Sequence, residues 1–237
     1  GVDDLVQAYK IGSGDITWCA FLESVAQKGK PVILSTGAST LEDVHRAVDS
    51  ILAHNNQICL LQCNTNYTNE LSNFGYINLS VLHAFQNLYP GIPMGLSDHT
   101  PGHATALGAV ALGGRMIEKH FTDDNGRPGP DHAFSMTPIT WREMVDRTRE
   151  LEASFGDGVK RVEENEIDSA VVQRRCLRLA RPKRAGETLT ADDIVALRPA
   201  PADALPPYQL EKWLGATFTS DKAEGEALFS YDLRNDA

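Results

Sequence analysis

The sequence predicts an α/β fold: an incomplete TIM-type (β/α)8 barrel, formed by about its last five βα units, followed by a small mixed β-rich domain. Five short apolar runs recur at regular intervals with helical patterns between them, which is typical of a parallel barrel. Polar residues gather where each run ends, and the sequence changes character after Gly156. Because barrel enzymes keep their chemistry at the carboxyl ends of the strands, those ends mark the expected active site.

Each apolar run predicts one strand, and the segments between the runs predict helices. Ser39 with Glu42, and Thr140 with Glu143, have the spacing of a capping box at a helix start. Residues 104–114 are nearly all small or apolar, which favours a helix lying close against a parallel sheet. The expected strands are residues 8–11, 31–34, 58–61, 93–96 and 116–120.

The barrel pattern stops before a barrel is complete. A full barrel has eight strands in about 250 residues, whereas the βα pattern here ends after five. Five open strands would expose edges that invite pairing, so we expect residues 1–156 to be the C-terminal part of a barrel without its first three units. Residues 157–170 predict a polar linker, and residues 171–237 predict a separate domain with a β-like run over 171–179 and a short helix capped by Thr190.

Composition and charge exclude several classes of protein. With 237 residues, 42% hydrophobic and 23% charged, the chain can bury a sizeable core. Its net charge of −10 argues against a nucleic-acid or anionic-membrane partner, since both need clustered basic residues. No apolar run is long enough to cross a bilayer and Gly1 opens no signal-peptide pattern, so the expected location is cytoplasmic. The four cysteines form no CxxC pair and are expected to be reduced.

Two histidines stand at the ends of consecutive predicted strands. His99 and His120 are distant in sequence, but the carboxyl ends of parallel strands meet at one rim, and neutral imidazole binds divalent metal ions. Hydrogen-bonded rim histidines without a metal are the alternative. No cysteine accompanies them, which argues against a closed zinc site, and two protein ligands would leave positions open for water and substrate.

Lysine and serine residues follow the same rim. Lys10 offers a compact positive charge, and Ser13, Ser35 and Ser97 offer hydroxyl donors of the kind that hold phosphate oxygens. Ser97 precedes His99 by two residues, so both side chains face the same way on a strand. Capping of the following helix is the alternative, and for Ser35 alone it is the better one.

Five strings and the C-terminal domain carry a family resemblance. The strings are KIGSGD at residues 10–15, ILSTG at 33–37, GLSDHT at 95–100, EKHFT at 118–122 and RPGPDH at 127–132. Their order, spacing and content resemble the sialic acid synthase family, which includes N-acetylneuraminate, legionaminate and pseudaminate synthases. The strings AGETLTADDI and LRP, in the small domain, are similar to that family's antifreeze-like (SAF) domain.

The resemblance implies a reaction, a cofactor and partners. Members of the family condense phosphoenolpyruvate with an N-acetylmannosamine-like aldehyde sugar to give a nine-carbon nonulosonate and phosphate. A divalent metal, Mn or Mg, activates the aldehyde. The expected partners are therefore phosphoenolpyruvate, an N-acylated amino sugar and a second subunit in a domain-swapped homodimer.

The resemblance also assigns roles residue by residue. The catalytic metal ligands that it implies are His99 and His120. The phosphoenolpyruvate contacts that it implies are Lys10, Ser13, Ser35 and Ser97. The sugar contacts that it implies are Thr65, Tyr67, Asp131 and, reaching across the dimer, Arg198.

The sugar-binding region departs from the family's usual HCTxxYP pattern. Residues 62–68 read QCNTNYT, Thr65 stands where the family usually has Asn or Ser, and a plain Asn-rich turn is an equal alternative there. The acceptor therefore stays open between N-acetylmannosamine, a bacillosamine-derived sugar and a relative of these.

Two other classes of protein stay open at this point. A metal-dependent aldolase, or another keto-deoxy sugar acid synthase, would keep both histidines but would be indifferent to Arg198→Ala. A non-catalytic SAF-type binding module would place the function in residues 171–237, although that segment has few threonines for the flat array of an ice-binding surface.

The family also draws an acidic residue, a second lysine and a hydroxyl from its first three strands, and none has a counterpart here. We therefore expect no measurable synthase activity from this chain alone.

Overall fold

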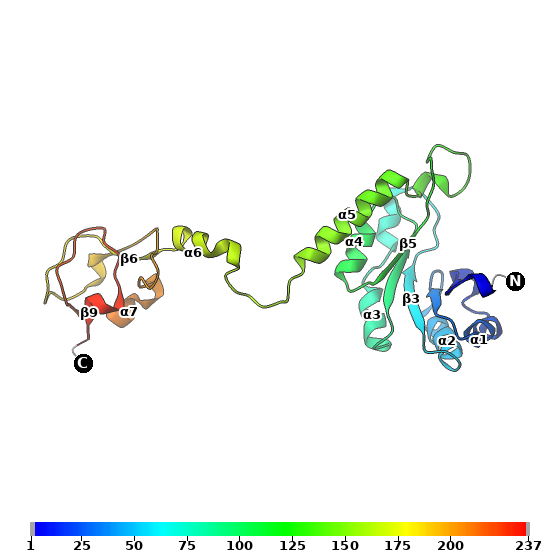
Figure 1. Cartoon of the computed structure of the whole chain (residues 1–237), viewed down its shortest axis with the longest axis horizontal. Coiled ribbons are helices and arrows are strands. Elements are labelled where there is room, and N and C mark those ends of the chain that lie inside the picture. The colour runs from blue at the N-terminus through cyan, green and yellow to red at the C-terminus, as the bar shows by residue number, and fades with distance from the viewer. Residues whose placement is uncertain (1–2, 236–237) are drawn as a thin grey trace. The chain divides into compact units, whose positions relative to one another are not determined.

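In the computed structural model, which describes residues 3–235, the first unit of the chain is built on one parallel sheet (Figure 1). The strands lie in the order in which they occur along the chain, and each crossover to the next strand contains a helix. The predicted strands are confirmed, with ends that shift by one or two residues. They are β1 (Tyr9–Ile11), β2 (Val32–Ser35), β3 (Ile58–Cys63), β4 (Met94–Asp98) and β5 (Met116–Lys119).

One helix follows each strand of this sheet. Within the described part of the chain no helix is long and apolar enough to cross a membrane. All four cysteines are free, as predicted. The helices are α1 (Cys19–Ala26), α2 (Leu41–Leu52), α3 (Val81–Leu88), α4 (Ala104–Ala111) and α5 (Pro138–Ser154).

Both predicted capping boxes are wrong in position. The first begins one residue later than predicted, at Thr40 with Asp43, and the second begins three residues earlier, at Thr137 with Thr140. Pro138 explains the second shift, because its fixed φ suits the first position of a helix and its missing N–H costs nothing there. The helices themselves occur where the apolar periodicity predicts them.

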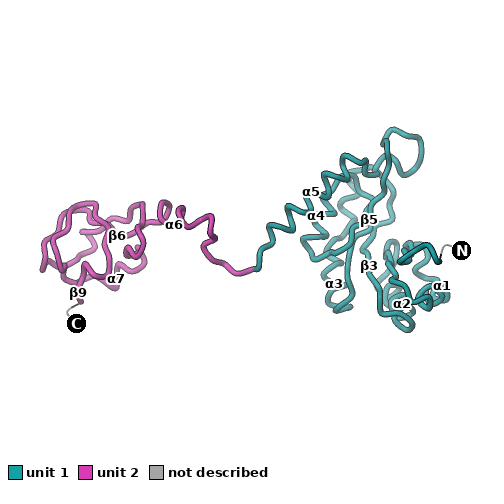
Figure 2. The backbone as a smooth tube through the Cα atoms, viewed as in Figure 1, with its two compact units in different colours: residues 1–157 teal, residues 158–237 magenta. Residues whose placement is uncertain are grey.

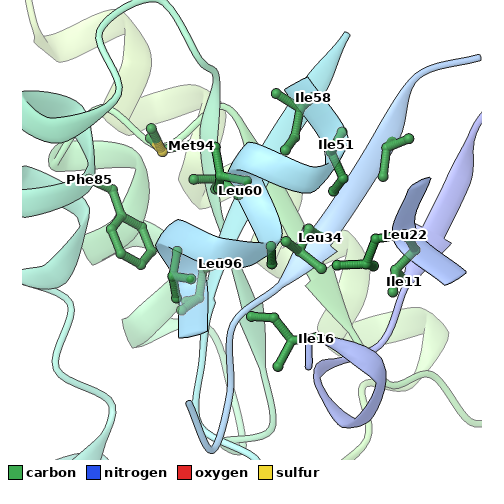
Figure 3. Close-up of a cluster of buried hydrophobic side chains, with 14 of the residues drawn as sticks. Ile11, Ile16, Leu22, Leu34, Ile51, Ile58, Leu60, Phe85, Met94 and Leu96 are labelled. Carbon is green, nitrogen blue, oxygen red and sulfur yellow. The ribbon is translucent and has the colours of Figure 1, made fainter. Parts of the chain in front are cut away.

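Apolar side chains fill the space between the sheet and its helices (Figure 3). Side chains alternate along a strand, so each strand sends one set of residues into this core and the other set to the opposite face. Leu34, Leu60 and Leu96 from three neighbouring strands are fully buried. Truncation of such a leucine to alanine typically costs about 2–5 kcal/mol. Helices contribute Leu22, Ile51 and Phe85 to the same core.

The sheet is curled rather than flat, as a contact between its two edge strands demonstrates. Nζ of Lys10 on β1 lies 3.2 Å from Oε1 of Glu118 on β5. Four strand spacings of about 4.8 Å would hold these edges roughly 19 Å apart in a flat sheet. The face opposite the helices is therefore concave, and the polar side chains of the strands converge on it.

The second unit, residues 158–237, is the magenta part of Figure 2. It has its own small core and two antiparallel strand pairs, β6 (Cys176–Leu179) with β7 (Ile194–Leu197) and β8 (Thr217–Phe218) with β9 (Leu233–Arg234). The β-like run predicted over residues 171–179 is wrong over residues 171–175, because a helix continues as far as Gln173 and the strand begins only at Cys176. The helix that Thr190 caps is confirmed as a short 3-10 turn. The unit also contains α6 (Ile167–Gln173) and α7 (Leu210–Trp213).

Two buried aspartates repeat one construction in the two halves of this unit. Nζ of Lys183 lies 3.0 Å from the carboxylate of Asp193, and Nζ of Lys222 lies 3.0 Å from that of Asp232. Each carboxylate also accepts from the backbone N–H three residues earlier. The two lysines pair with one another through their backbone groups. The two halves of the unit are thus joined at matching positions.

Asp193 makes the stability of the second unit sensitive to acid. Burial alone raises the pKa of Asp193, but hydrogen bonds from Thr190, Arg181 and Lys183 outweigh it and hold the pKa well below its usual range. A carboxyl with a folded pKa below its unfolded value of about 3.9 adds stability above that pH, and this stability is lost as the pH falls.

We expect urea unfolding of the second unit to shift to lower urea as the pH drops below about 4. Asp193→Asn should be less stable at neutral pH and should show a flatter pH dependence, because the group that titrates has gone. Asp192→Asn, at an exposed neighbouring position, is the control and should keep the wild-type profile. An Asp193→Asn profile parallel to that of the wild type would contradict the assignment.

Candidate active site

His99 and His120 lie side by side where β4 and β5 end. Their ring centroids are 5.1 Å apart, and the planes of the rings are inclined by 61°. His99 is buried, with 4% of its surface exposed. Tyr67 and Phe134 both pack against the two rings, with Tyr67 closest to His99 at 4.2 Å between centroids. The fold therefore brings together the two histidines that stand at the ends of consecutive strands.

The Nδ1 atoms of both rings face oxygen atoms. Nδ1 of His99 lies 2.8 Å from the carbonyl oxygen of Asn64, which can only accept, so Nδ1 carries the proton and Nε2 keeps a lone pair. Nδ1 of His120 lies 3.4 Å from a carboxylate oxygen of Asp131. Burial lowers the pKa of His99, which favours its neutral form. Partners of this kind orient histidines that bind metal ions.

The donor set fits a divalent metal ion that takes two ligands from the protein. Across residues 3–235, no cluster of three or more His, Cys, Asp and Glu side chains is placed to hold an ion. Two imidazoles whose Nδ1 atoms face oxygen atoms keep the lone pairs of their Nε2 atoms, and neutral imidazole is a common ligand of divalent metal ions. Water or substrate oxygens would complete its coordination.

Glu118 joins two of the residues expected to bind phosphoenolpyruvate. Its Oε1 lies 3.2 Å from Nζ of Lys10 and accepts a hydrogen bond of 2.7 Å from Oγ of Ser97. Glu118 begins the string EKHFT, but neither the strand-end pattern nor the resemblance assigns it a role. Glu118 precedes His120 by two residues, so their side chains face the same way. Ser97 and His99 have the same spacing, and this shared spacing is the signal in the sequence that points to Glu118.

Ser35 has a buried hydroxyl without a hydrogen-bond partner among the described residues. Its side chain is at the end of β2, and the residue is 1% exposed. An unpaired buried polar group costs about 1–3 kcal/mol, and a ligand oxygen would satisfy it. Ser13 instead accepts a hydrogen bond of 2.8 Å from the N–H of Gly37. A Cβ at Gly37 would lie 2.4 Å from the methyl group of Thr65, so this close approach requires glycine.

A cavity of about 470 Å³ opens beside these residues. Its size is within the range of small-molecule sites. Of the residues expected to bind sugar, Thr65 and Tyr67 line it, whereas Asp131 lies against His120. Arg198 belongs to the second unit, where it follows β7 and is exposed. The cavity is lined by Ser13, Gly14, Ile16, Thr17, Ala38, Thr65 and Tyr67.

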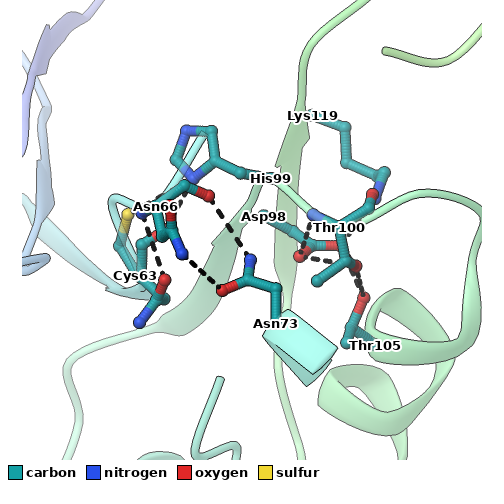
Figure 4. A network of polar contacts seen from close by, with 9 residues as sticks. Cys63, Asn66, Asn73, Asp98, His99, Thr100, Thr105 and Lys119 are labelled. Atoms are coloured by element: carbon teal, nitrogen blue, oxygen red, sulfur yellow. Dashed lines mark hydrogen bonds and ion pairs between the residues drawn. The ribbon is translucent and has the colours of Figure 1, made fainter. Parts of the chain in front are cut away.

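Behind the histidines, a buried ion pair ties the ends of β4 and β5 together (Figure 4). Nζ of Lys119 lies 2.6 Å from the carboxylate of Asp98, and both side chains are almost fully buried. The side chains of Thr100 and Thr105 donate to the same carboxylate. Lys119 also donates to the carbonyl of Thr100 at 2.7 Å. The network thereby fixes the backbone on both sides of His99.

Comparison with protein families divides the chain as the fold does. Residues 2–160 match the model of the NeuB family, and residues 174–234 match the model of the SAF domain.

Comparison with individual proteins finds relatives that are longer than this chain. It is 38% identical over 98% of its length to an uncharacterised protein of Methanocaldococcus jannaschii, covering 67% of that protein. It is 32% identical to the N,N'-diacetyllegionaminic acid synthase of Legionella pneumophila, covering 94% of this chain and 62% of the synthase. The chain thus spans about two thirds of the length of these relatives.

A solved structure of similar fold is the N-acetylneuraminic acid (sialic acid) synthetase of Leptospira borgpetersenii in complex with citrate. The two chains are 32% identical with a TM-score of 0.61, and the match covers 69% of this chain and 56% of the synthetase. The match extends the sequence similarity to the three-dimensional arrangement.

Removing one partner of the buried ion pair should destabilise the first unit strongly. Lys119→Met leaves the carboxylate of Asp98 buried without its counter-charge, and we expect a loss of about 3–5 kcal/mol in the free energy of unfolding. Urea denaturation measures it. The double variant Asp98→Asn/Lys119→Met should lose less than the sum of the two single variants. Arg46→Met, which breaks an exposed pair, should cost no more than about 1 kcal/mol. Additive losses in the double variant would show that the pair is not coupled.

Proposed function

The chain belongs to the NeuB family and carries a SAF domain, and from that premise we propose that it acts in a nonulosonate synthase. The proposed reaction condenses phosphoenolpyruvate with an N-acylated amino aldehyde sugar and one water molecule: a carbon–carbon bond forms, and phosphate leaves by cleavage of its carbon–oxygen bond. The observation that carries the proposal is the pair His99 and His120 beside Lys10 and Ser97 on one concave face. This arrangement would place the proposed metal site next to the proposed anion site, as the reaction requires.

His99 and His120 are the proposed ligands of a divalent cation, Mn or Mg. When bound, the cation would supply Lewis-acid chemistry at the aldehyde oxygen of the sugar. The protein's contribution is to hold each ring in one orientation, through Asn64 at His99 and Asp131 at His120. Asp131 thus has a proposed role in orienting His120, in addition to the sugar contact that the resemblance implies.

Lys10, Ser13, Ser35 and Ser97 are the proposed contacts of phosphoenolpyruvate. Lys10 is a positively charged donor on the concave face, and its charge now pairs with that of Glu118. The unpartnered hydroxyl of Ser35 supports the proposal, because an anionic ligand would provide the acceptor that it lacks. Glu118 now pairs with Lys10 and Ser97, so an anion that binds there competes with this carboxylate for both donors.

The cavity lined by Thr65 and Tyr67 is the proposed sugar subsite. Tyr67 is half-exposed and packs against His99, so a sugar in the cavity would lie next to the proposed metal site. Arg198 is the proposed contact from the SAF domain of a second subunit, in a domain-swapped homodimer. The sialic and legionaminic acid synthases among the relatives support an N-acylated amino sugar as the acceptor.

Binding of Mn²⁺ to the chain tests the metal site. We expect His99→Asn and His120→Asn each to weaken binding at least about tenfold, since each removes a proposed ligand and even the loss of a partner that orients a ligand typically costs 10- to 100-fold in affinity. Electron paramagnetic resonance of free Mn²⁺ during a titration measures the affinity. His83→Asn, at an exposed position on α3, is the matched control and should bind as the wild type does. Equal affinity in all variants would refute the assignment.

Binding of phosphoenolpyruvate to the chain tests the anion site. Lys10→Met removes a charged hydrogen-bond donor worth about 1.5–3 kcal/mol, so we expect roughly 10- to 100-fold weaker binding by calorimetry. Lys28→Met, whose lysine pairs with Asp3 instead, should leave the affinity unchanged. If the wild-type chain binds neither Mn²⁺ nor phosphoenolpyruvate, the proposed function is overturned.

A further inference from the structure

The loop that follows β3 contacts His99 in two ways. The carbonyl of Asn64 accepts the hydrogen bond from Nδ1 of His99, and the ring of Tyr67 packs 4.2 Å from the imidazole. Residues 64–70 form no helix or strand, so no regular backbone ladder holds them in place. A segment of this kind keeps one conformation only where side-chain contacts offset the entropy of ordering it.

Asn73 supplies such contacts from the next turn of the chain. It lies in the 3-10 helix Leu71–Tyr76 and is 1% exposed, although it is an amide. Its Nδ2 donates to the carbonyl of Asn66, and its Oδ1 accepts from Nδ2 of Asn66, both at 3.3 Å. Burial of an amide is unfavourable unless its groups are paired, so the loop conformation that pairs them is strongly preferred.

The hydrogen bonds continue from Asn66 to His99 (Figure 4). The backbone N–H of Asn66 donates to the side-chain Oδ1 of Asn64 at 3.1 Å. The backbone carbonyl of the same Asn64 accepts the hydrogen bond from Nδ1 of His99. The thiol of Cys63 lies 4.0 Å from the same Nδ1, but sulfur is a weak acceptor. The Asn64 carbonyl is therefore the contact that decides which nitrogen of His99 carries the proton.

We propose that Asn73 is a positioning residue for His99. By pairing with the backbone carbonyl and the side-chain Nδ2 of Asn66, it fixes the loop so that the backbone carbonyl of Asn64 stays on Nδ1 and the lone pair stays on Nε2. Without Asn73 the loop moves, the ring loses its acceptor, and both tautomers become populated. The part of the proposal that concerns tautomers stands on geometry alone, and the part that concerns metal affinity rests on the proposed function.

The first test needs no metal. Nitrogen–proton correlation spectra of the histidine side chains report the tautomer of each ring, and His99→Asn identifies the His99 signals. We expect the wild type to show His99 with its proton on Nδ1, and Asn73→Ala to show mixed tautomers. Asn66→Ala should change the spectrum in the same direction and to a smaller extent. Because Asn66 is exposed, this variant should fold even if Asn73→Ala does not.

Asn55→Ala is the matched control. Asn55 is also buried, with Nδ2 donating to the Lys30 carbonyl at 2.7 Å and Oδ1 accepting from the N–H of Gln57 at 2.9 Å. It precedes β3, at the end opposite to the histidines. It should lose stability as Asn73→Ala does, without any change in the His99 tautomer. Unchanged His99 signals in both loop variants, or an equal change in Asn55→Ala, would overturn the proposal.

The second test measures Mn²⁺ affinity in the same proteins. Loss of a group that orients a metal ligand typically weakens binding 10- to 100-fold, so we expect about tenfold for Asn73→Ala and none for Asn55→Ala. If the wild type binds no Mn²⁺, the proposed metal role of His99 fails, while the tautomer spectra still decide the role of Asn73. If Asn73→Ala binds Mn²⁺ as the wild type does, Asn73 has no effect on the metal site.

Discussion

The buried ion pair between Asp98 and Lys119 is the constraint on which the site depends. These residues face each other in the register of β4 and β5. Because adjacent residues of a strand point to opposite faces, a pair held on the helix side determines which residues face the concave side. A slip of one residue would bury uncompensated charges and turn His99 and His120 away from each other. The arrangement that keeps the two buried charges paired is thus the one that places the two histidines together.

Much of the first unit is predictable because its strands are continuous apolar runs, and such runs are typical of a parallel sheet covered by helices. Boundaries are less predictable, as the two displaced capping boxes demonstrate, since several hydroxyl and acidic residues near each helix start can serve as caps. The run at residues 171–179 is misleading for another reason. Val171 and Val172 favour strands by composition, but both are exposed and belong to a helix. Composition decides little where a side chain has no core to join.

Of the candidate site, the sequence predicts the residues that can be found by spacing along one strand. Ser97 and His99 are examples, because two residues apart means one face. The partners of these residues are harder to predict, since they come from other elements. The contact of Lys10 with Glu118 depends on how far the sheet curls, and that of Asn73 with Asn66 depends on how a loop folds back. Neither quantity is encoded in a local pattern.

Glu118 has a consequence for selectivity that extends beyond the residues it contacts. Because this carboxylate already neutralises Lys10 and satisfies Ser97, long-range attraction contributes little to the arrival of an anion at that position. If phosphoenolpyruvate binds there as proposed, its charged oxygens would have to replace the contacts that Lys10 and Ser97 now make with Glu118. An anion that makes only weak hydrogen bonds would then be a poor competitor for this position, because it would have to displace a carboxylate.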